Sequence, residues 1–185
     1  MTPGIKPLVA GNWKMNGLGQ DLGELAEMGT AFSPELQKKI DMLICPPSTL
    51  LFRASEIAKP GKVAVGAQDC HGEASGAHTG DISVEMILDA GATSVIVGHS
   101  ERRIDHGEFN IAVHDKAKSA LWAGLQTIIC IGETAAGKKA GATLDVLKDQ
   151  MANSIPDDWA KGEVVIAYEP VWAIGTGVTP TAEDV

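Results

Sequence analysis

The chain has 185 residues, 44% of them hydrophobic, and a net charge of −9. This length and composition allow one substantial core, and no segment reads as disordered. The acidic balance, without any block of Lys or Arg, argues against a nucleic acid or an anionic membrane as a partner. An anionic substrate would have to be held by local groups, because the global field repels it.

The start of the chain and its cysteines favour a cytoplasmic protein. The apolar run Leu8–Ala10 is far too short for the core of a signal peptide or for a membrane span. Three cysteines, Cys45, Cys70 and Cys130, form no CxxC pair. We therefore expect neither disulfides nor a structural zinc site.

Signals for cofactors and metals are weak. The stretch GTGVTP is not a dinucleotide fingerprint, because Pro180 stands where the third glycine would be. There is no Walker sequence, and the histidines outside the motifs described below lack metal-ligand spacing: His71, His78, His106 and His114. We expect no cofactor and no metal.

Six short apolar runs recur along the chain, each as long as a strand. They begin near Leu8, Met42, Val63, Ser94, Thr127 and Val164. The runs are continuous in Val, Ile, Leu and Cys, as in strands of a parallel sheet that are buried on both faces. Segments of helical character lie between them, at 21–32, 83–90, 110–123 and 143–155. This alternation predicts an α/β protein.

The spacing predicts a barrel that these residues do not close. An eight-unit barrel takes ~250 residues, or ~31 per unit, which is close to the spacing here. We therefore expect residues 1–185 to be a single barrel domain, incomplete at its C-terminal end. Thr179–Pro180, and Thr181 with Asp184 three residues later, are signals for the start of a further helix.

The first polar cluster that could carry chemistry follows the first strand. In AGNWKMN, Asn12 and Lys14 are two residues apart, so both side chains can point into one site. The alternative is a surface lysine beside a turn asparagine.

The second cluster is VIVGHSERR, in which His99, Ser100 and Glu101 come directly behind a buried strand. This could be a helix start with salt bridges and nothing more. In the functional interpretation, backbone N–H groups of a helix beginning near His99 keep its imidazole neutral.

The third cluster is AYEPVWAIGTG. Glu169 ends a buried strand and suits a general base, although it could also be a strand-end partner of a salt bridge. The stretch Ala173–Gly177 lies between stiffer segments and is typical of a lid, and its glycines let backbone amides approach an anion. The long loop Gln68–Asp81 is either functional, a partner contact or a plain surface loop.

With GNWKMN, GHSERR, CIGET and YEPVWAIGTG in this order, the chain closely resembles the triosephosphate isomerase family. The resemblance implies a (β/α)8 TIM barrel, truncated here to about six βα units. It also implies an enzyme of glycolysis and gluconeogenesis that interconverts dihydroxyacetone phosphate and glyceraldehyde 3-phosphate through an enediolate, without metal or cofactor.

The resemblance assigns a role to each motif residue. Glu169 would be the base, His99 a neutral electrophile, Lys14 the cation at the phosphate and enediolate, and Asn12 a hydrogen-bond donor to the reacting oxygen.

Further residues would support these four. Ser100, Glu101 and Cys130 would lie behind the catalytic groups, and the Gly175 amide would touch the phosphate. The lid would comprise Pro170, Val171, Trp172, Ala173, Ile174, Gly175, Thr176 and Gly177.

The resemblance also implies a homodimer for the complete protein. The loop containing Gln68, Thr79, Gly80 and Asp81 would insert into the partner subunit.

The family's last third carries a Ser-containing strand end and a Gly-Gly turn that grip the phosphate, and both are absent from these residues. The 185 residues alone are therefore expected to be inactive, as a non-catalytic fragment that needs its missing strands. A different phosphosugar isomerase on the same barrel fits less well, because YEPVWAIGTG together with GHSERR matches one family.

We predict that residues 1–185 alone are poorly soluble or associate, because an unclosed parallel sheet leaves two strand edges exposed. Size-exclusion chromatography with light scattering measures this directly. A monomer that melts cooperatively would contradict the prediction.

Overall fold

The computed structural model describes residues 4–157 and 163–184. The chain divides into two units, Met1–Val95 and Ile96–Val185, and each is described by itself. No helix among the described residues is long and apolar enough to cross a membrane.

The strands of the first unit are parallel and follow one another in chain order. They are β1 (Leu8–Asn12), β2 (Asp41–Cys45), β3 (Ala64–Ala67) and the beginning of β4 (Ser94–Val97). Asn12 lies opposite Cys45, and Ala67 lies opposite Val95. The carboxyl ends of these strands therefore come together at one edge of the sheet.

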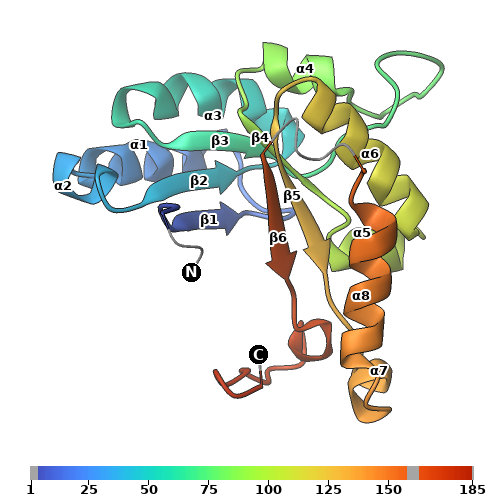
Figure 1. Cartoon of the computed structure of the whole chain (residues 1–185). Helices are drawn as coiled ribbons and strands as arrows, with labels where there is room; N and C mark the ends of the chain where they lie inside the picture. Colours follow the sequence, from blue (N-terminus) through green and yellow to red (C-terminus); the bar gives the residue numbers. More distant parts are fainter. Residues whose placement is uncertain (1–3, 158–162, 185) are drawn as a thin grey trace. The chain divides into compact units, whose positions relative to one another are not determined.

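The first unit's helices connect these strands. They are α1 (Leu22–Ala31), α2 (Pro34–Gln37), α3 (Leu51–Ala58) and α4 (Val84–Asp89), with the 3-10 turns η1 (Gly19–Asp21), η2 (Ser48–Leu50) and η3 (Lys59–Gly61). Helix α3 packs on β3, and α1 packs beside α3 (Figure 1). Leu25, Leu43 and Ile87 are fully buried in this core.

In the second unit, β5 (Gln126–Ile131) and β6 (Val164–Tyr168) pair in parallel. The helices are α5 (Ser100–Asp105), α6 (Asn110–Trp122), α7 (Ala135–Lys139) and α8 (Thr143–Ser154), followed by the 3-10 turn η5 (Val171–Ala173). Helices α6 and α8 pack against each other and against β5 (Figure 1). Val113, Ala117 and Ile129 fill the core between them.

The α/β alternation expected from the sequence is confirmed. Every predicted strand is present, and the four predicted helices begin and end within one residue of α1, α4, α6 and α8. Helices α2 and α3 were not predicted, and for α5 only a helix start near His99 was expected. These three helices have four to eight residues each, too few for a clear helical period.

The prediction that the strands are buried on both faces is confirmed for the inner strands and is wrong for the outer ones. All four residues of β4 are buried, whereas Val9 in β1 is 51% exposed and Ile166 in β6 is 36% exposed. Among the described residues, β1 pairs only with β2, and β6 pairs only with β5. Each outer strand therefore lacks the second neighbour that would cover it.

Two glycines allow α1 and η3 to approach closely in the first unit. A Cβ built on Gly61 would lie 2.2 Å from the Cα of Gly29, which is backbone and cannot move aside cheaply. In contrast, a Cβ on Gly23, in the same helix as Gly29, would meet no atom within 4 Å.

We expect Gly61→Ala to lower the free energy of unfolding by about 1–3 kcal/mol, as overpacking does. Gly23→Ala is the matched control and should leave the stability unchanged or slightly higher, because alanine favours a helix over glycine. Urea unfolding midpoints compare the two. Equal midpoints would show that the close approach does not constrain the fold.

Candidate active site

The predicted site residues of the second unit lie where its strands end. His99 and Ser100 follow β4, Cys130 is the second-to-last residue of β5, and Glu169 follows β6 directly. Parallel strands deliver such residues to one edge of a sheet, which is where α/β proteins bind their ligands.

His99 caps the N-terminus of α5 with its side chain. Its Nδ1 accepts a hydrogen bond from the backbone N–H of Glu101 at 3.2 Å. A nitrogen that accepts this bond carries no proton, so the proton of the neutral ring is on Nε2. The amide of Glu101, at the start of α5, thus donates to an unprotonated Nδ1, as expected for a neutral imidazole.

Glu169 is held by Ser100 and faces His99. Its Oε2 accepts hydrogen bonds from the Ser100 hydroxyl at 2.5 Å and from the Ser100 amide at 3.3 Å. Its Oε1 is buried, has no hydrogen-bond partner among the described residues, and lies 3.6 Å from Nε2 of His99. One carboxylate oxygen is thus fixed, and the other is available to take a proton. Both side chains are only 12–13% exposed.

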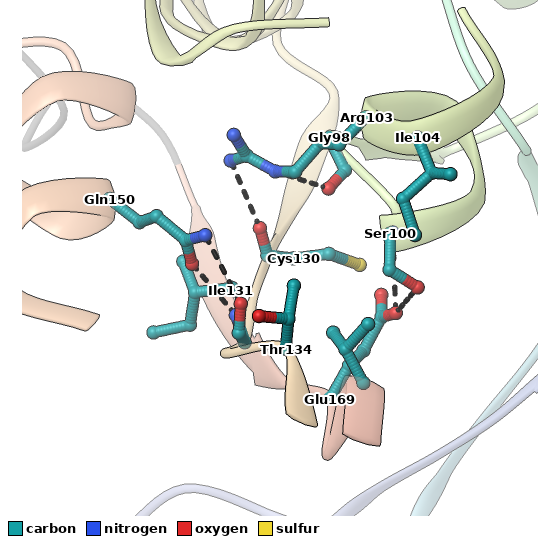
Figure 2. A pocket seen from close by; sticks show the side chains of 11 residues that line it. Gly98, Ser100, Arg103, Ile104, Cys130, Ile131, Thr134, Gln150 and Glu169 are labelled. Carbon is teal, nitrogen blue, oxygen red and sulfur yellow. Dashed lines mark hydrogen bonds between the residues drawn. The ribbon is translucent and has the colours of Figure 1, made fainter. Parts of the chain in front are cut away.

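A pocket of about 100 Å³ opens beside this pair. In Figure 2, the Cys130 thiol points toward the side of the pocket on which Ser100 and Glu169 lie. Ligand pockets usually measure ~300–1,000 Å³, so this pocket is smaller than a typical ligand site.

Four hydrogen bonds that the sequence did not reveal fix the ends of the strands. Arg103 donates hydrogen bonds to the carbonyl oxygens of Gly98 at 2.9 Å and Cys130 at 3.3 Å. Gln150 bonds both the amide and the carbonyl of Gly132, at 2.7 and 3.1 Å (Figure 2). Desolvation lowers the pKa of the Arg103 guanidinium from its ordinary value. It stays charged nonetheless, because an arginine's pKa starts so high.

Gly132 allows β5 and β6 to approach just below Glu169. A Cβ on Gly132 would lie 2.0 Å from the carbonyl oxygen of Glu169. Any side chain at this position would push the backbone that carries the carboxylate. The CIGET motif therefore contributes its glycine to the placement of Glu169.

The glutamate of the same motif is also structural. Glu133 is 1% exposed, and it accepts hydrogen bonds from the hydroxyls of Tyr168 at 3.1 Å and Thr143 at 3.2 Å. Desolvation raises the pKa of Tyr168, and the neighbouring Glu133 carboxylate raises it further, so the hydroxyl remains a donor. This link ties the last residue of β6 to the loop after β5.

The predicted lid begins as the turn η5 and continues through two glycines in left-handed conformations, Gly175 (φ 72°) and Gly177 (φ 78°). Lys138 of α7 lies over the Trp172 ring, 3.3 Å from its centroid, and also pairs with Asp184 at 3.2 Å. The resemblance to the family implies a surface helix at GETAAGKKAG that leaves the catalytic set intact, and this helix is α7. The structure shows that it contacts the lid.

In the first unit, Asn12 and Lys14 lie together at the end of β1. Lys14 has a left-handed backbone (φ 53°), which is rare for a residue with a side chain. The Asn12 side chain accepts a hydrogen bond from the Lys14 amide at 2.8 Å. Gln68 donates bonds to the Lys14 and Cys45 carbonyls, both at 2.9 Å. Strain that is held in place in this way is typical of functional positions.

The remaining predicted residues of the loop after β3 lie on the surface. Thr79, Gly80 and Asp81 are exposed, and Gly80 has φ 95°. The site residues are thus divided: Asn12, Lys14 and this loop belong to the first unit, and the His99 and Glu169 group belongs to the second.

The comparisons with known proteins all point to the same family. The family model of triosephosphate isomerase matches residues 7–185. Triosephosphate isomerase of Afipia carboxidovorans is 57% identical over 181 residues, which are 98% of this chain and 72% of the relative. The chain belongs to the triosephosphate isomerase family. The enzyme of a Bradyrhizobium species is also 57% identical, over all of this chain and 74% of its own length.

A solved structure agrees. The crystal structure of triosephosphate isomerase from Bartonella henselae has a TM-score of 0.84 and 44% sequence identity, and it covers 91% of this chain and 69% of its own. The fold is therefore that of the TIM barrel, an α/β barrel of which the described residues supply six parallel strands.

We predict that Lys138→Met loosens the lid, because the variant loses the cation–π contact with Trp172. Such a contact is worth ~0.5–1 kcal/mol at exposed sites, so amide exchange of residues 171–177 should quicken about two- to fivefold. Asp184→Asn, which keeps the lysine, should have the smaller effect. Hydrogen–deuterium exchange with mass spectrometry compares the variants, and unchanged exchange in Lys138→Met would exclude this contact as a restraint on the lid.

Proposed function

We propose that this protein interconverts dihydroxyacetone phosphate and glyceraldehyde 3-phosphate, as a triose-phosphate isomerase of glycolysis and gluconeogenesis. The proposal is supported by membership of the family and by one arrangement in the second unit. The unpartnered Oε1 of Glu169 lies 3.6 Å from Nε2 of His99, which bears the proton of the neutral ring.

This arrangement suits the movement of a proton between adjacent carbons. In the proposed reaction, Glu169 takes a proton from the hydroxyl-bearing carbon next to the carbonyl. The C–H electron pair forms the double bond of the enediolate, and charge develops on the carbonyl oxygen. The Nε2–H of His99 donates its proton to that oxygen, and the same nitrogen takes the hydroxyl proton from the neighbouring oxygen. Glu169 then returns its proton to the neighbouring carbon, which gives the isomer.

Lys14 and Asn12 are proposed to act from the first unit. Lys14 would supply positive charge to the phosphate and the enediolate, which a chain of net charge −9 needs from a local group. Asn12 would hydrogen-bond the reacting oxygen. The left-handed backbone of Lys14 supports this role, because Asn12 and Gln68 both hold it in place.

The lid is proposed to close over the substrate, with the Gly175 amide touching the phosphate. Closure excludes water and so protects the enediolate from losing its phosphate group. The left-handed glycines at 175 and 177 support such a movement. No metal or cofactor has a part in the proposed reaction.

We also propose a cytoplasmic homodimer, in which the loop of Gln68, Thr79, Gly80 and Asp81 contacts the partner. The resemblance to the family carries this proposal, and the exposure of Thr79, Gly80 and Asp81 supports it.

We propose, finally, that the 185 residues by themselves turn over little substrate. They span 72% of the Afipia relative, and the family's Ser-containing strand end and Gly-Gly turn have no counterpart among them.

A coupled assay for glyceraldehyde 3-phosphate tests both proposals when it is run on the chain and on a fusion. In the fusion, the unmatched C-terminal part of the Afipia relative follows residue 185. We expect little turnover from the chain and fast turnover from the fusion. An active chain would overturn only the proposed inactivity, whereas a folded but inactive fusion would overturn the proposed reaction.

In the fusion, Glu169→Asp should lower kcat by about 100-fold or more and change KM little, because the carboxylate, shortened by one methylene, no longer reaches the proton. The control is Glu163→Asp, which shortens an exposed carboxylate before β6 and should leave kcat unchanged. Equal rates for Glu169→Asp and the unmodified fusion would rule out Glu169 as the base.

A further inference from the structure

The outer face of α6 carries a stripe of four exposed residues. They follow one another at intervals of four, three and four positions and are Ile111, Asp115, Lys118 and Trp122. At this spacing their side chains lie along one side of the helix over about 16 Å. Ile111 is 66% exposed and Trp122 is 67% exposed. We call these four residues the α6 stripe.

The α6 stripe lies opposite the side by which the helix packs into its own unit. Val113, Ala117 and Ala120 are fully buried on the side that faces α8 and β5. With 3.6 residues per turn, they lie about half a turn away from the stripe. Packing within the chain therefore gives no reason for an isoleucine and a tryptophan on the outer face.

The spacing of the α6 stripe is suited to contact with a second helix. Alternating steps of four and three residues are those of the a and d positions of a coiled coil, whose side chains meet the facing helix. In the stripe, large apolar residues occupy the two ends, and an acidic and a basic residue occupy the middle.

The order of these residues makes the stripe complementary to itself. In an antiparallel pair of helices, a two-fold axis midway between positions 116 and 117 brings Asp115 opposite Lys118 of the second copy. The same axis brings Ile111 opposite Trp122 of the second copy. A parallel pair would instead place Asp115 opposite Asp115 and Lys118 opposite Lys118. Like charges that face each other are unfavourable, so the charges select the antiparallel arrangement.

Both charges of the stripe can take part in such a contact. Among the described residues, Lys118 makes no ion pair, and Asp115 pairs with the neighbouring His114 ring, Oδ1 to Nδ1 at 3.1 Å. The apolar ends add burial, because a tryptophan side chain can bury ~150–250 Å².

We propose that the α6 stripe binds the α6 stripe of a second copy, as an antiparallel helix pair about a two-fold axis. A second copy is favoured over an unrelated partner because one axis satisfies both the charged and the apolar pairs. A standard interface has ~20–30 residues a side, so a contact of four residues is weak. We expect a dimer that forms at roughly 10–100 μM or above.

This contact is separate from the homodimer proposed above, because none of its residues belongs to the loop after β3. It is also independent of the proposed isomerase activity. Association through that loop or through the edges of the sheet uses other residues and should not respond to changes in the stripe.

Sedimentation equilibrium of the 185-residue chain over a wide range of concentrations tests the proposal. Asp115→Lys and Lys118→Asp should each weaken the association about tenfold, because each places like charges opposite one another and the axis repeats the change. The exchange Asp115→Lys/Lys118→Asp restores opposite charges and should return the association to within threefold. The matched controls are Asp145→Lys and Lys148→Asp, which reverse an exposed pair of the same spacing on α8 and should stay within twofold.

Trp122→Gln tests the apolar ends and should weaken the association at least tenfold. Far-UV circular dichroism checks that each variant keeps its helices. The same series in the fusion described above, whose added strands should cover the edges of the sheet, removes association through those edges.

Three results would overturn the proposal. The first is an association that neither the charge reversals nor Trp122→Gln changes, since the copies then meet through other residues. The second is an exchange variant that stays as weak as the single reversals, since α6 would then bind a different surface. The third is a chain and a fusion whose association does not increase with concentration in the range expected for this contact.

Discussion

The amide of Glu101 donates a hydrogen bond to Nδ1 of His99, and the chemistry of the candidate site depends on it. With Nδ1 occupied, the ring presents an N–H at Nε2, 3.6 Å from the unpartnered oxygen of Glu169. The same helix start also supplies Ser100, whose hydroxyl and amide hold the other oxygen of that carboxylate. His99, which precedes α5, and the first two residues of α5 thus set both the electrophile and the resting position of the base.

Partly buried hydrogen bonds keep this geometry, and they come from residues outside the proposed catalytic set. Arg103 joins the end of β4 to β5 through two carbonyls, and Gln150 of α8 fixes the backbone of Gly132. The missing side chain of Gly132 lets the strand that ends in Glu169 come close. Each of these groups is paired, which is the condition under which buried polar atoms stabilise a unique arrangement.

The sequence predicts the fold well because its signals are local. Apolar runs mark the strands, and the motifs at their ends identify Asn12, Lys14, His99 and Glu169 as the candidate set. Contacts between side chains distant in the chain were not predictable. No local pattern pairs Glu133 with Tyr168 or Lys138 with Trp172. The exposed residues of β1 and β6 agree with the expected unclosed sheet, although an apolar run by itself predicts burial on both faces.

The tautomer of His99 is the most direct test of this account. Nitrogen-15 NMR of the histidine-labelled chain at pH 7 distinguishes a protonated from an unprotonated ring nitrogen. We predict a neutral ring for His99, with the proton on Nε2 and an unprotonated Nδ1 that accepts a hydrogen bond from the Glu101 amide. A proton on Nδ1, or a doubly protonated ring, would contradict it, because His99 could not then be a neutral donor beside Glu169.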